Sequence, residues 1–326
     1  MFQKYKKRII YSIVFGALFY LALSIYANLN DLMVAFSKFN WYIFPLVLVL
    51  SFLNYVSRFL KWEYYTKVLN IHIDRKISFM IFLSSFIMAI TPGKVGEVFK
   101  SYLLKEHNGT SISKSAPIVL AERITDFLSL IFLSMIGAIL FGYGTKLIII
   151  VGIFFVILII IISSKKISYS IIGLLEKINF VSRVSHKIHE AYDSIYQMIR
   201  FRQLVIALLL SVLAWFFECM GFYIVANSFS AASIIHVDIF AATFIYGFAT
   251  IAGAVTMLPG GLGATDASIA FLLVSLKNIS ENIAVAATLI IRVATLWFAV
   301  IVGIIAILIY QKISHSNLKD IALDTK

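Results

Sequence analysis

Long apolar runs constrain this sequence more than any other feature. They lie at about residues 9–27, 42–60, 147–162 and 283–310, and the charged residues within them are Arg58 and Arg292. A helix needs roughly 20 apolar residues to cross the hydrocarbon core of a bilayer. Because no water reaches that core, a spanning segment has to be a helix or part of a closed barrel. The runs are continuous and lack the alternation of barrel strands. The sequence therefore predicts an all-α polytopic membrane protein.

The composition agrees with a single membrane domain over residues 1–326. Hydrophobic residues make up 61% of the chain and charged residues 13%, whereas a globular domain carries about 25% charged residues. Cys219 is the single cysteine and excludes an intramolecular disulfide, so we expect a buried, inert thiol. The first run is too long for a signal peptide and no cleavage site follows it, which favours a retained span.

Six full spans are predicted, together with two shorter pairs of apolar segments. The spans lie at about 9–27, 41–60, 117–142, 147–163, 203–228 and 283–310. The pairs are 77–91 with 95–104 and 238–258 with 264–276. The first piece would rise only about 22 Å as a helix, short of the ~30 Å core. We therefore predict a re-entrant hairpin there and, by analogy, a second one, although 238–258 is long enough to span. The hinge residues are Pro92, Gly93, Gly96, Pro259, Gly260, Gly261 and Gly263.

The distribution of Lys and Arg predicts the orientation. With the N-terminus in the cytoplasm, 22 of the 28 basic residues fall in the cytoplasmic segments 1–8, 61–76, 94–115, 164–202 and 311–326. Three lie in external segments (Lys38, Lys146 and Lys277), and three lie within spans (Arg58, Arg123 and Arg292). This bias is what the positive-inside rule expects in a cell membrane, with both termini cytoplasmic. It also accounts for most of the net charge of +12 without a nucleic-acid partner.

The two hinges belong to an internal repeat. Pro92, Gly93 and Gly96 recur 167 residues later, and Arg123 recurs 169 residues later as Arg292. Both halves, about 9–142 and 147–310, follow the plan span, span, hairpin, span with inverted orientation. Broken apolar segments at matching positions point to the binding site of a transporter.

The stretch 165–200 carries an apolar helical face. Its members are Val181, Val184, Ile188, Tyr192, Ile195 and Ile199. This spacing predicts an amphipathic cytoplasmic helix on the inner leaflet, with its cations toward anionic headgroups.

Charged residues within or beside the apolar runs are the candidate site residues. They are Glu122, Arg123, Asp126, Glu218, Asp266 and Arg292. Each would cost about 2.5–3.5 kcal/mol at the bilayer centre, so they have to face the bundle interior. Structural ion pairs and a polar pathway across the membrane are both compatible with them, and the repeat and the hinges favour the pathway.

The hinges add a second element to this site. A helix that begins after a Pro-Gly break presents free N–H groups and its positive dipole end, which suits an anion. The alternative explanation for the glycines is close helix packing. With Lys94 at the first hinge, we expect Arg123 and Arg292 to meet at one cavity, partly neutralised by Glu122, Asp126 and Asp266.

Four motifs together resemble a known family. They are Thr91-Pro92-Gly93-Lys94-Val95-Gly96-Glu97-Val98, Tyr102-Leu103-Leu104, Glu122-Arg123-Ile124-Thr125-Asp126 and Leu258-Pro259-Gly260-Gly261-Leu262-Gly263. The chain resembles the transmembrane-region family of lysylphosphatidylglycerol synthase, the flippase-like membrane domain of the multiple peptide resistance factor. The resemblance covers nearly the whole chain and carries over Lys94, Glu97, Glu122, Arg123, Asp126, Asp266 and Arg292 as functional candidates. We expect no counterpart of the soluble aminoacyl-transfer domain of that factor.

The resemblance implies a lipid translocase for an anionic phospholipid or a polyprenyl-phosphate-linked lipid. Its partners would be membrane lipids with anionic headgroups, and further copies of the chain or a lipid-biosynthetic protein. We expect no enzyme activity, cofactor or metal. Two alternatives stay open: an enzyme or subunit of polyprenol-linked sugar metabolism, and an ion-coupled transporter of a small solute using Glu218 and Asp266.

Overall fold

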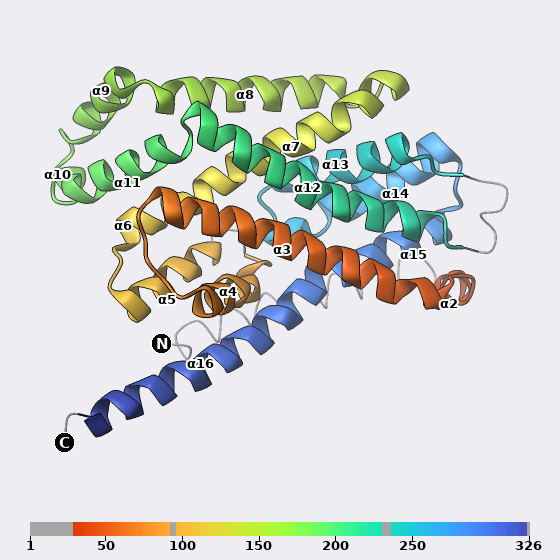
Figure 1. The fold of residues 1–326 in the computed structure, drawn as a ribbon. Coiled ribbons are helices and arrows are strands. Elements are labelled where there is room, and N and C mark those ends of the chain that lie inside the picture. Colours follow the sequence, from red (N-terminus) through yellow and green to blue (C-terminus); the bar gives the residue numbers. More distant parts are fainter. Residues whose placement is uncertain (1–28, 92–95, 230–235, 325–326) are drawn as a thin grey trace.

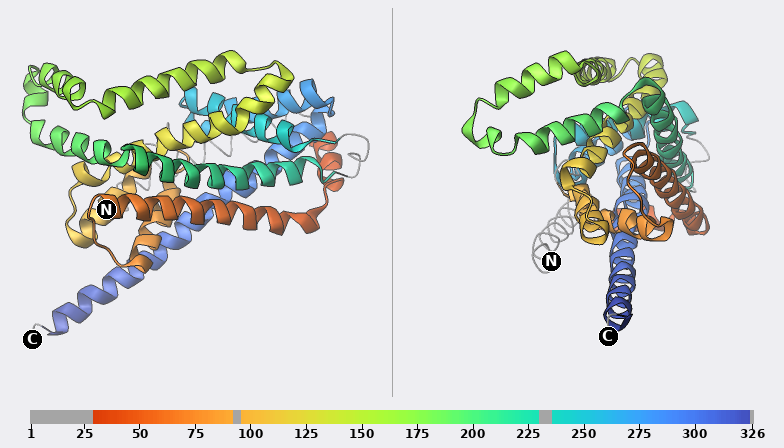
Figure 2. Two further views of the ribbon diagram at one scale, coloured as in Figure 1. Left: turned by 45° about the horizontal axis from the view of Figure 1, so that its top comes forward. Right: turned by 60° about the vertical axis from the view of Figure 1, so that its left-hand side comes forward.

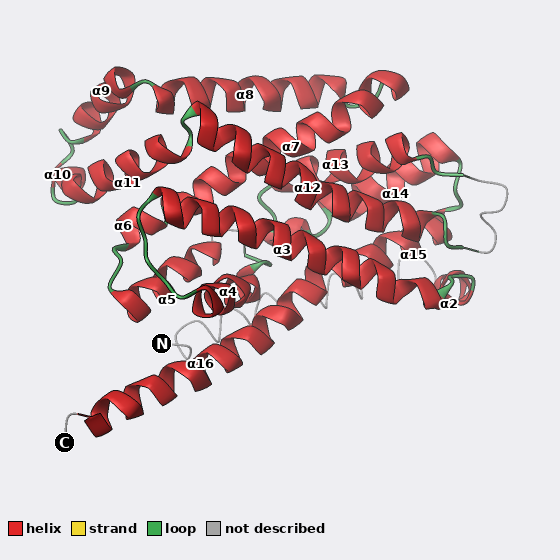
Figure 3. Cartoon of the chain, viewed as in Figure 1, coloured by secondary structure: helices red, strands yellow, loops and turns green. Residues whose placement is uncertain are grey.

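The computed structural model describes residues 29–91, 96–229 and 236–324, and every regular element within these ranges is helical (Figures 1 and 3). An isolated β-bridge joins Phe39 to Phe229. The α-helices are α2 (Leu29–Ser37), α3 (Phe44–Val68), α4 (Arg75–Ser84), α5 (Phe99–Asn108), α6 (Ile112–Ser115), α7 (Pro117–Phe141), α8 (Thr145–Ser163), α9 (Lys165–Leu175), α10 (Asn179–Ser182), α11 (Ser185–Met198), α12 (Phe201–Ala226), α13 (Ile239–Val255), α14 (Ala264–Lys277), α15 (Glu281–Arg292) and α16 (Phe298–Asp324). Short helices η1 (Trp41–Ile43), η2 (Ser85–Met88), η5 (Pro259–Gly261) and the π-helix η6 (Val293–Trp297) join them.

Six helical stretches of the described chain are long and apolar enough to cross a membrane. They are Trp41–Val68, Ile112–Phe141, Thr145–Ser163, Phe201–Ala226, Pro259–Lys277 and Glu281–Ile313. The predicted all-α polytopic class is confirmed. Five of the six predicted spans are among these stretches, whereas 9–27 lies outside the described residues. The remaining stretch, Pro259–Lys277, was predicted as part of a hairpin. Re-entry of the two hairpins and the inverted repeat stay predictions.

Local sequence explains where several of these helices begin and end. Asp74 caps α4 by accepting from the backbone N–H groups of Lys76 and Ile77 at 2.9 and 3.3 Å. Asp238 caps α13 in the same way, at 2.9 Å from the N–H of Ala241. Gly142 ends α7 in the left-handed conformation.

The long helices form one bundle around a shared core. α3 packs along α12, and α7 packs against both α12 and α13 (Figures 1 and 2). α16 packs against α4 and η2. α8 lies at the edge of the bundle, mainly against α7, and it is the most apolar and least buried of the six stretches. Such a helix presents most of its side chains to lipid.

The break at Pro259 is confirmed. α13 ends at Val255, and Gly260, Gly261 and Gly263 have φ values of +61°, +67° and +88° before α14 begins. Residues with a Cβ atom rarely adopt this backbone conformation, so glycine is needed here. The break at Pro92 and Gly93 lies in residues 92–95, outside the described chain. Its flanks are helical on both sides, η2 before it and α5 after it.

The stretch 165–200 differs from the single helix predicted for it. It forms α9, α10 and α11. The Ser185 hydroxyl donates to the Glu176 carboxylate, and His189 Nε2 lies 2.8 Å from the same carboxylate. These two hydrogen bonds lower the pKa of Glu176. The apolar side of α11 is buried against α6 and α7, with Tyr192 and Ile195 8% and 5% exposed. The amphipathic face therefore packs on protein, because neighbouring helices lie within its reach.

The last span contains a π-helical segment directly after Arg292. α15 ends there, η6 covers Val293–Trp297, and α16 continues as a helix beyond the predicted end of the span at residue 310. Neither Gly nor Pro occurs between Ile304 and Asp324, which explains the continuation. Single-turn π-bulges are frequent at functional sites, and Thr295 and Leu296 of this one line the cavity described next.

Candidate functional site

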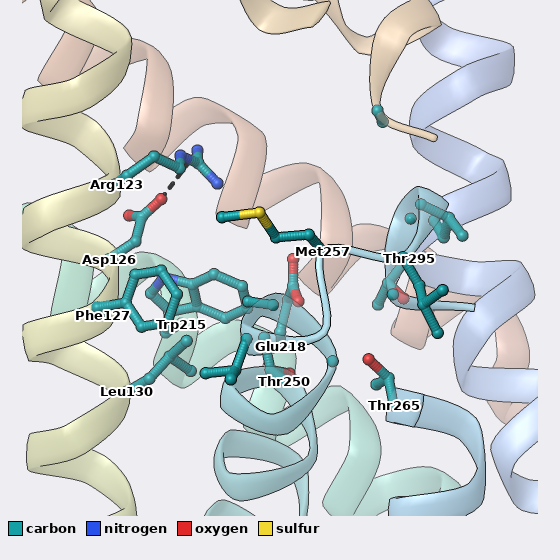
Figure 4. Close-up of a pocket in the computed structure, with 18 of the residues that line it drawn as sticks. Arg123, Asp126, Phe127, Leu130, Trp215, Glu218, Thr250, Met257, Thr265 and Thr295 are labelled. Carbon is teal, nitrogen blue, oxygen red and sulfur yellow. Dashed lines mark ion pairs between the residues drawn. The ribbon is translucent and has the colours of Figure 1, made fainter. Parts of the chain in front are cut away.

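A cavity of about 560 Å³ lies between α3, α7, α8, α12, α13 and the last span (Figure 4). Residues of both halves line it, including Arg123 and Asp126 from α7 and Arg292 from α15. The predicted meeting of Arg123 and Arg292 at one cavity is thus found. The Pro-Gly loop contributes Gly260 and Gly261 to the same lining.

The first half contributes a network of buried ion pairs around Arg123. One nitrogen of this guanidinium, Nη2, lies 3.2 Å from Oε2 of Glu97 and 3.0 Å from Oδ2 of Asp126. Arg58 on α3 approaches the same Glu97 at 3.3 Å. Figure 4 shows the Arg123–Asp126 pair at one side of the cavity.

Lys61 on α3 is a further cation of this network and does not itself line the cavity. Its Nζ donates to Asp126 Oδ1 at 2.7 Å, to the Ser211 hydroxyl at 2.6 Å and to the Thr125 hydroxyl at 3.2 Å. The side chain is completely buried. The carboxylate and the two hydroxyls around it offset the cost of burying the lysine side chain.

The second half contains a corresponding pair. Arg292 lies 2.9 Å from Oδ1 of Asp266, and its Nη2 donates to the carbonyl oxygen of Gly260 at 2.5 Å. Asp266, the third residue of α14, also accepts from the N–H of the N-cap residue Gly263 at 2.9 Å, which stabilises the start of the helix. Arg292 and Asp266 therefore fasten the Pro-Gly loop to the start of α14.

Glu218, Tyr55 and Tyr246 also line the cavity. The Tyr246 hydroxyl donates to Glu218 Oε2 at 2.7 Å. The Tyr55 hydroxyl donates to the Thr295 carbonyl at 2.8 Å, a backbone oxygen within the π-helix. Among the described residues, Glu218 has no Lys, Arg or His nitrogen within 4.0 Å.

The structure brings most of the predicted site residues to this cavity. Glu97, Arg123, Asp126, Glu218 and Arg292 line it. Asp266 pairs with Arg292 but does not line the cavity. Lys94 is outside the described residues. Glu122 does not line the cavity, and its Oε2 pairs with Lys100 at 2.6 Å. The expectation that Glu122 neutralises an arginine is therefore wrong, because its side chain points toward α5 and a nearer cation.

Arg58 lines the cavity and Lys61 belongs to its ion-pair network, and both were missed, as was the buried Lys100, which pairs with Glu122 away from the cavity lining. Arg58 was assigned to a span without a role, and Lys61 and Lys100 were assigned to cytoplasmic segments, yet both lysines are completely buried. A signal for the first two was present in the sequence. Polar residues follow one face of α3 at spacings of three and four: Ser51, Asn54, Arg58, Lys61 and Tyr65.

The exposure of the lining divides the cavity chemically. Among the described lining residues, the five exposed ones are all apolar and are 41–69% exposed: Ile150, Phe154, Val255, Met257 and Leu258. Of the charged lining residues, Arg58, Glu97, Asp126 and Arg292 are at most 8% exposed, and Arg123 and Glu218 are partly buried. The cavity thus joins an apolar outer surface to a charged interior.

These features define a polytopic helical membrane protein whose spanning helices enclose a charged cavity. The chain matches the family described as the lysylphosphatidylglycerol synthase TM region over residues 9–303. It belongs to that family.

Its curated relatives include several archaeal UPF0104 membrane proteins. One from Methanothermobacter thermautotrophicus is 26% identical over 287 residues, which cover 80% of this chain and 83% of the relative. One from Methanocaldococcus jannaschii is 25% identical over 321 residues, covering 92% and 94%. One from Archaeoglobus fulgidus is 27% identical over 262 residues, covering 72% and 76%.

Proposed function

We propose that this protein is a lipid translocase that moves a phosphate-bearing headgroup across the membrane through the charged cavity. The acyl or prenyl chains stay in the surrounding lipid. The observation that carries the proposal is the division of the cavity lining, with apolar residues where it is exposed and charged residues where it is buried. A lipid has the same division, because its chains are apolar and its headgroup is charged.

The position of the apolar lining supports entry from the side. Ile150 and Phe154 lie on α8, the outermost helix, and Val255, Met257 and Leu258 lie at the end of α13 and in the loop that follows. A cavity lined this way at its exposed part would favour lipid chains over water by the hydrophobic effect. A small hydrophilic solute would gain nothing from such an entrance.

The buried lining supports an anionic headgroup. Arginine offers a planar set of N–H donors that suits phosphate oxygens, and three arginines line the cavity: Arg58, Arg123 and Arg292. The neighbouring carboxylates Glu97, Asp126 and Asp266 balance them within 3.3 Å. A site with balanced charge binds a phosphate without holding it too strongly for release.

A reconstitution assay tests the function. Vesicles would contain the purified protein and a phosphatidylglycerol with a fluorescent label on one acyl chain. Dithionite added outside bleaches the label in the outer leaflet. Protein that moves the lipid outward from the inner leaflet should therefore cause the loss of nearly all fluorescence. Protein-free vesicles should lose about half. Arg123→Gln should slow the protein-dependent phase roughly tenfold or more, since a charge-assisted hydrogen bond contributes about 1.5–3 kcal/mol.

Lys105→Gln is the matched control for this assay. Lys105 is an exposed lysine on α5 that lines no part of the cavity, and its removal should leave the rate unchanged. A labelled polyprenyl phosphate in parallel vesicles distinguishes the two lipid classes. Wild-type vesicles that bleach like protein-free vesicles with both lipids would refute the translocase proposal.

We also propose that the protein lies in the cell membrane with both termini cytoplasmic, on the basis of the Lys and Arg distribution. A single cysteine would be introduced at Lys146 or at Ser170, both exposed positions. The parent chain would carry Cys219→Ala, so that the introduced cysteine is the one thiol available for labelling. An impermeant maleimide added to intact cells should label Lys146→Cys and spare Ser170→Cys. The opposite pattern would invert the proposed orientation.

A further inference from the structure

Arg123 is the member of the network that is best placed to exchange partners. Its side chain is 17% exposed, more than any other ion-paired side chain around the cavity. A single nitrogen, Nη2, makes both ion pairs, to Glu97 and to Asp126. Its Nε is buried and has no hydrogen-bond partner among the described residues. The guanidinium thus keeps a donor that no described residue uses and that a turn of the side chain would present to the cavity.

Both carboxylates that hold Arg123 have a second cation of their own. Glu97 keeps Arg58 at 3.3 Å, and Asp126 keeps Lys61 at 2.7 Å. Lys61 is fixed by Ser211 and Thr125, so it stays on Asp126 when Arg123 moves. Arg123 can therefore leave without exposing an unpaired carboxylate to a low dielectric, which is the step that makes breaking a buried ion pair costly.

Arg292 lacks this arrangement. Among the described residues it is the one cation within 4.0 Å of Asp266. It also donates to the Gly260 carbonyl at 2.5 Å. Turning Arg292 toward a ligand would strip Asp266 of its cation and release the Pro-Gly loop, so the two arginines that recur in the repeat are not equivalent.

We propose that Arg123 is the exchangeable cation that takes the phosphate of the lipid, while Arg58 and Lys61 are positioning residues that hold Glu97 and Asp126 during the exchange. Arg292 holds the loop and stays in place. The inference rests on the proposed function for its ligand, a lipid phosphate monoester or diester. When the phosphate leaves, Glu97 and Asp126 recapture Arg123, and this competition sets the release of the headgroup.

Thermal unfolding of purified protein in detergent, with and without short-chain phosphatidylglycerol, tests the proposal. A ligand that binds the folded state raises its melting temperature. Arg123→Gln should melt within about 3 °C of wild type but lose the lipid-induced shift, with affinity reduced roughly tenfold or more. Arg292→Gln should melt roughly 10 °C lower. Diacylglycerol is the phosphate-free control and should shift neither protein.

Lys61→Met tests the positioning role separately. With Lys61 gone, Asp126 depends on Arg123 and should retain it, so the phosphatidylglycerol-induced shift should shrink although Arg123 is intact. Adding Asp126→Asn should restore the shift, because no carboxylate is then left to retain Arg123 at that point. A purely structural Lys61 would lower the melting temperature and leave the lipid-induced shift unchanged.

The outcomes separate this proposal from the translocase function. The exchange of Arg123 is overturned if Arg123→Gln unfolds as readily as Arg292→Gln, or if it binds phosphatidylglycerol like the wild type. This holds even when wild-type protein translocates lipid in vesicles. Wild-type protein that behaves as expected in detergent but moves no lipid in vesicles overturns the translocase function and leaves the exchange of Arg123 standing. Replacing phosphatidylglycerol by a short-chain polyprenyl phosphate shows which phosphate source is preferred.

Discussion

Lys100→Met should prevent most of the protein from accumulating in a folded state. Lys100 Nζ pairs with Glu122 at 2.6 Å and lies 4.7 Å from the centroid of the Trp62 ring, and both charged residues are at most 1% exposed. Removing the lysine leaves a buried carboxylate without its cation, which costs on the order of 3–5 kcal/mol. Yield of monodisperse protein and unfolding in detergent measure the effect.

A second substitution should reverse this loss. Lys100→Met combined with Glu122→Met replaces the pair by apolar side chains of similar volume, a change that is often neutral in buried pairs. Because neither residue lines the cavity, the double variant should also translocate lipid at the wild-type rate per folded molecule. A folded but inactive double variant would return Glu122 to the functional site. Lys105→Gln, an exposed change on the same helix, is the control for mutation of α5.

Gly303→Ala should destabilise the protein by about 1–3 kcal/mol or more, the range of an overpacked core position. A Cβ at residue 303 would lie 2.5 Å from the backbone nitrogen of Ile87 and 2.9 Å from the carbonyl carbon of Phe86. These are backbone atoms of η2, so a side-chain rotation cannot relieve the contact. α16 and η2 would have to separate, and η2 leads into Ala89 and Thr91 of the cavity lining.

Gly152→Ala is the matched control for this prediction. A Cβ at residue 152 of α8 would meet nothing closer than 3.9 Å, from the Ile131 side chain. Alanine is favoured over glycine within a helix by about 1 kcal/mol, so this variant should match or exceed the wild-type melting temperature. Equal melting temperatures for both variants would show that α16 and η2 separate without cost.

Much of the candidate site was predictable from the positions of charge in the sequence. A charged residue within an apolar run has to face the protein interior, because lipid cannot solvate it. This argument alone brought Arg123, Asp126, Glu218 and Arg292 to a common interior, where all four now line one cavity. It failed for Glu122, since facing the interior does not determine which part of the interior a side chain reaches.

Lys61 and Lys100 show the limit of the same argument. Lys61 directly follows the apolar run 42–60, and Lys100 lies in the short segment 95–104. A long basic side chain beside an apolar run ordinarily extends to the membrane surface. Both are instead completely buried. Their partners Asp126 and Glu122 come from α7, and Ser211 from α12. Contacts between residues 22 to 150 positions apart depend on how helices cross, which hydropathy and charge bias do not contain.

The sequence by itself determined the helical membrane class, most of the spans and the break at Pro259, because these follow from apolar length and from backbone geometry along the chain. Only the tertiary structure decided which cation pairs with which carboxylate. It also decided that the face of α11 packs on protein and that the exposed lining of the cavity is apolar. Those outcomes depend on distances between side chains of different helices, and such distances exist only once the helices have packed.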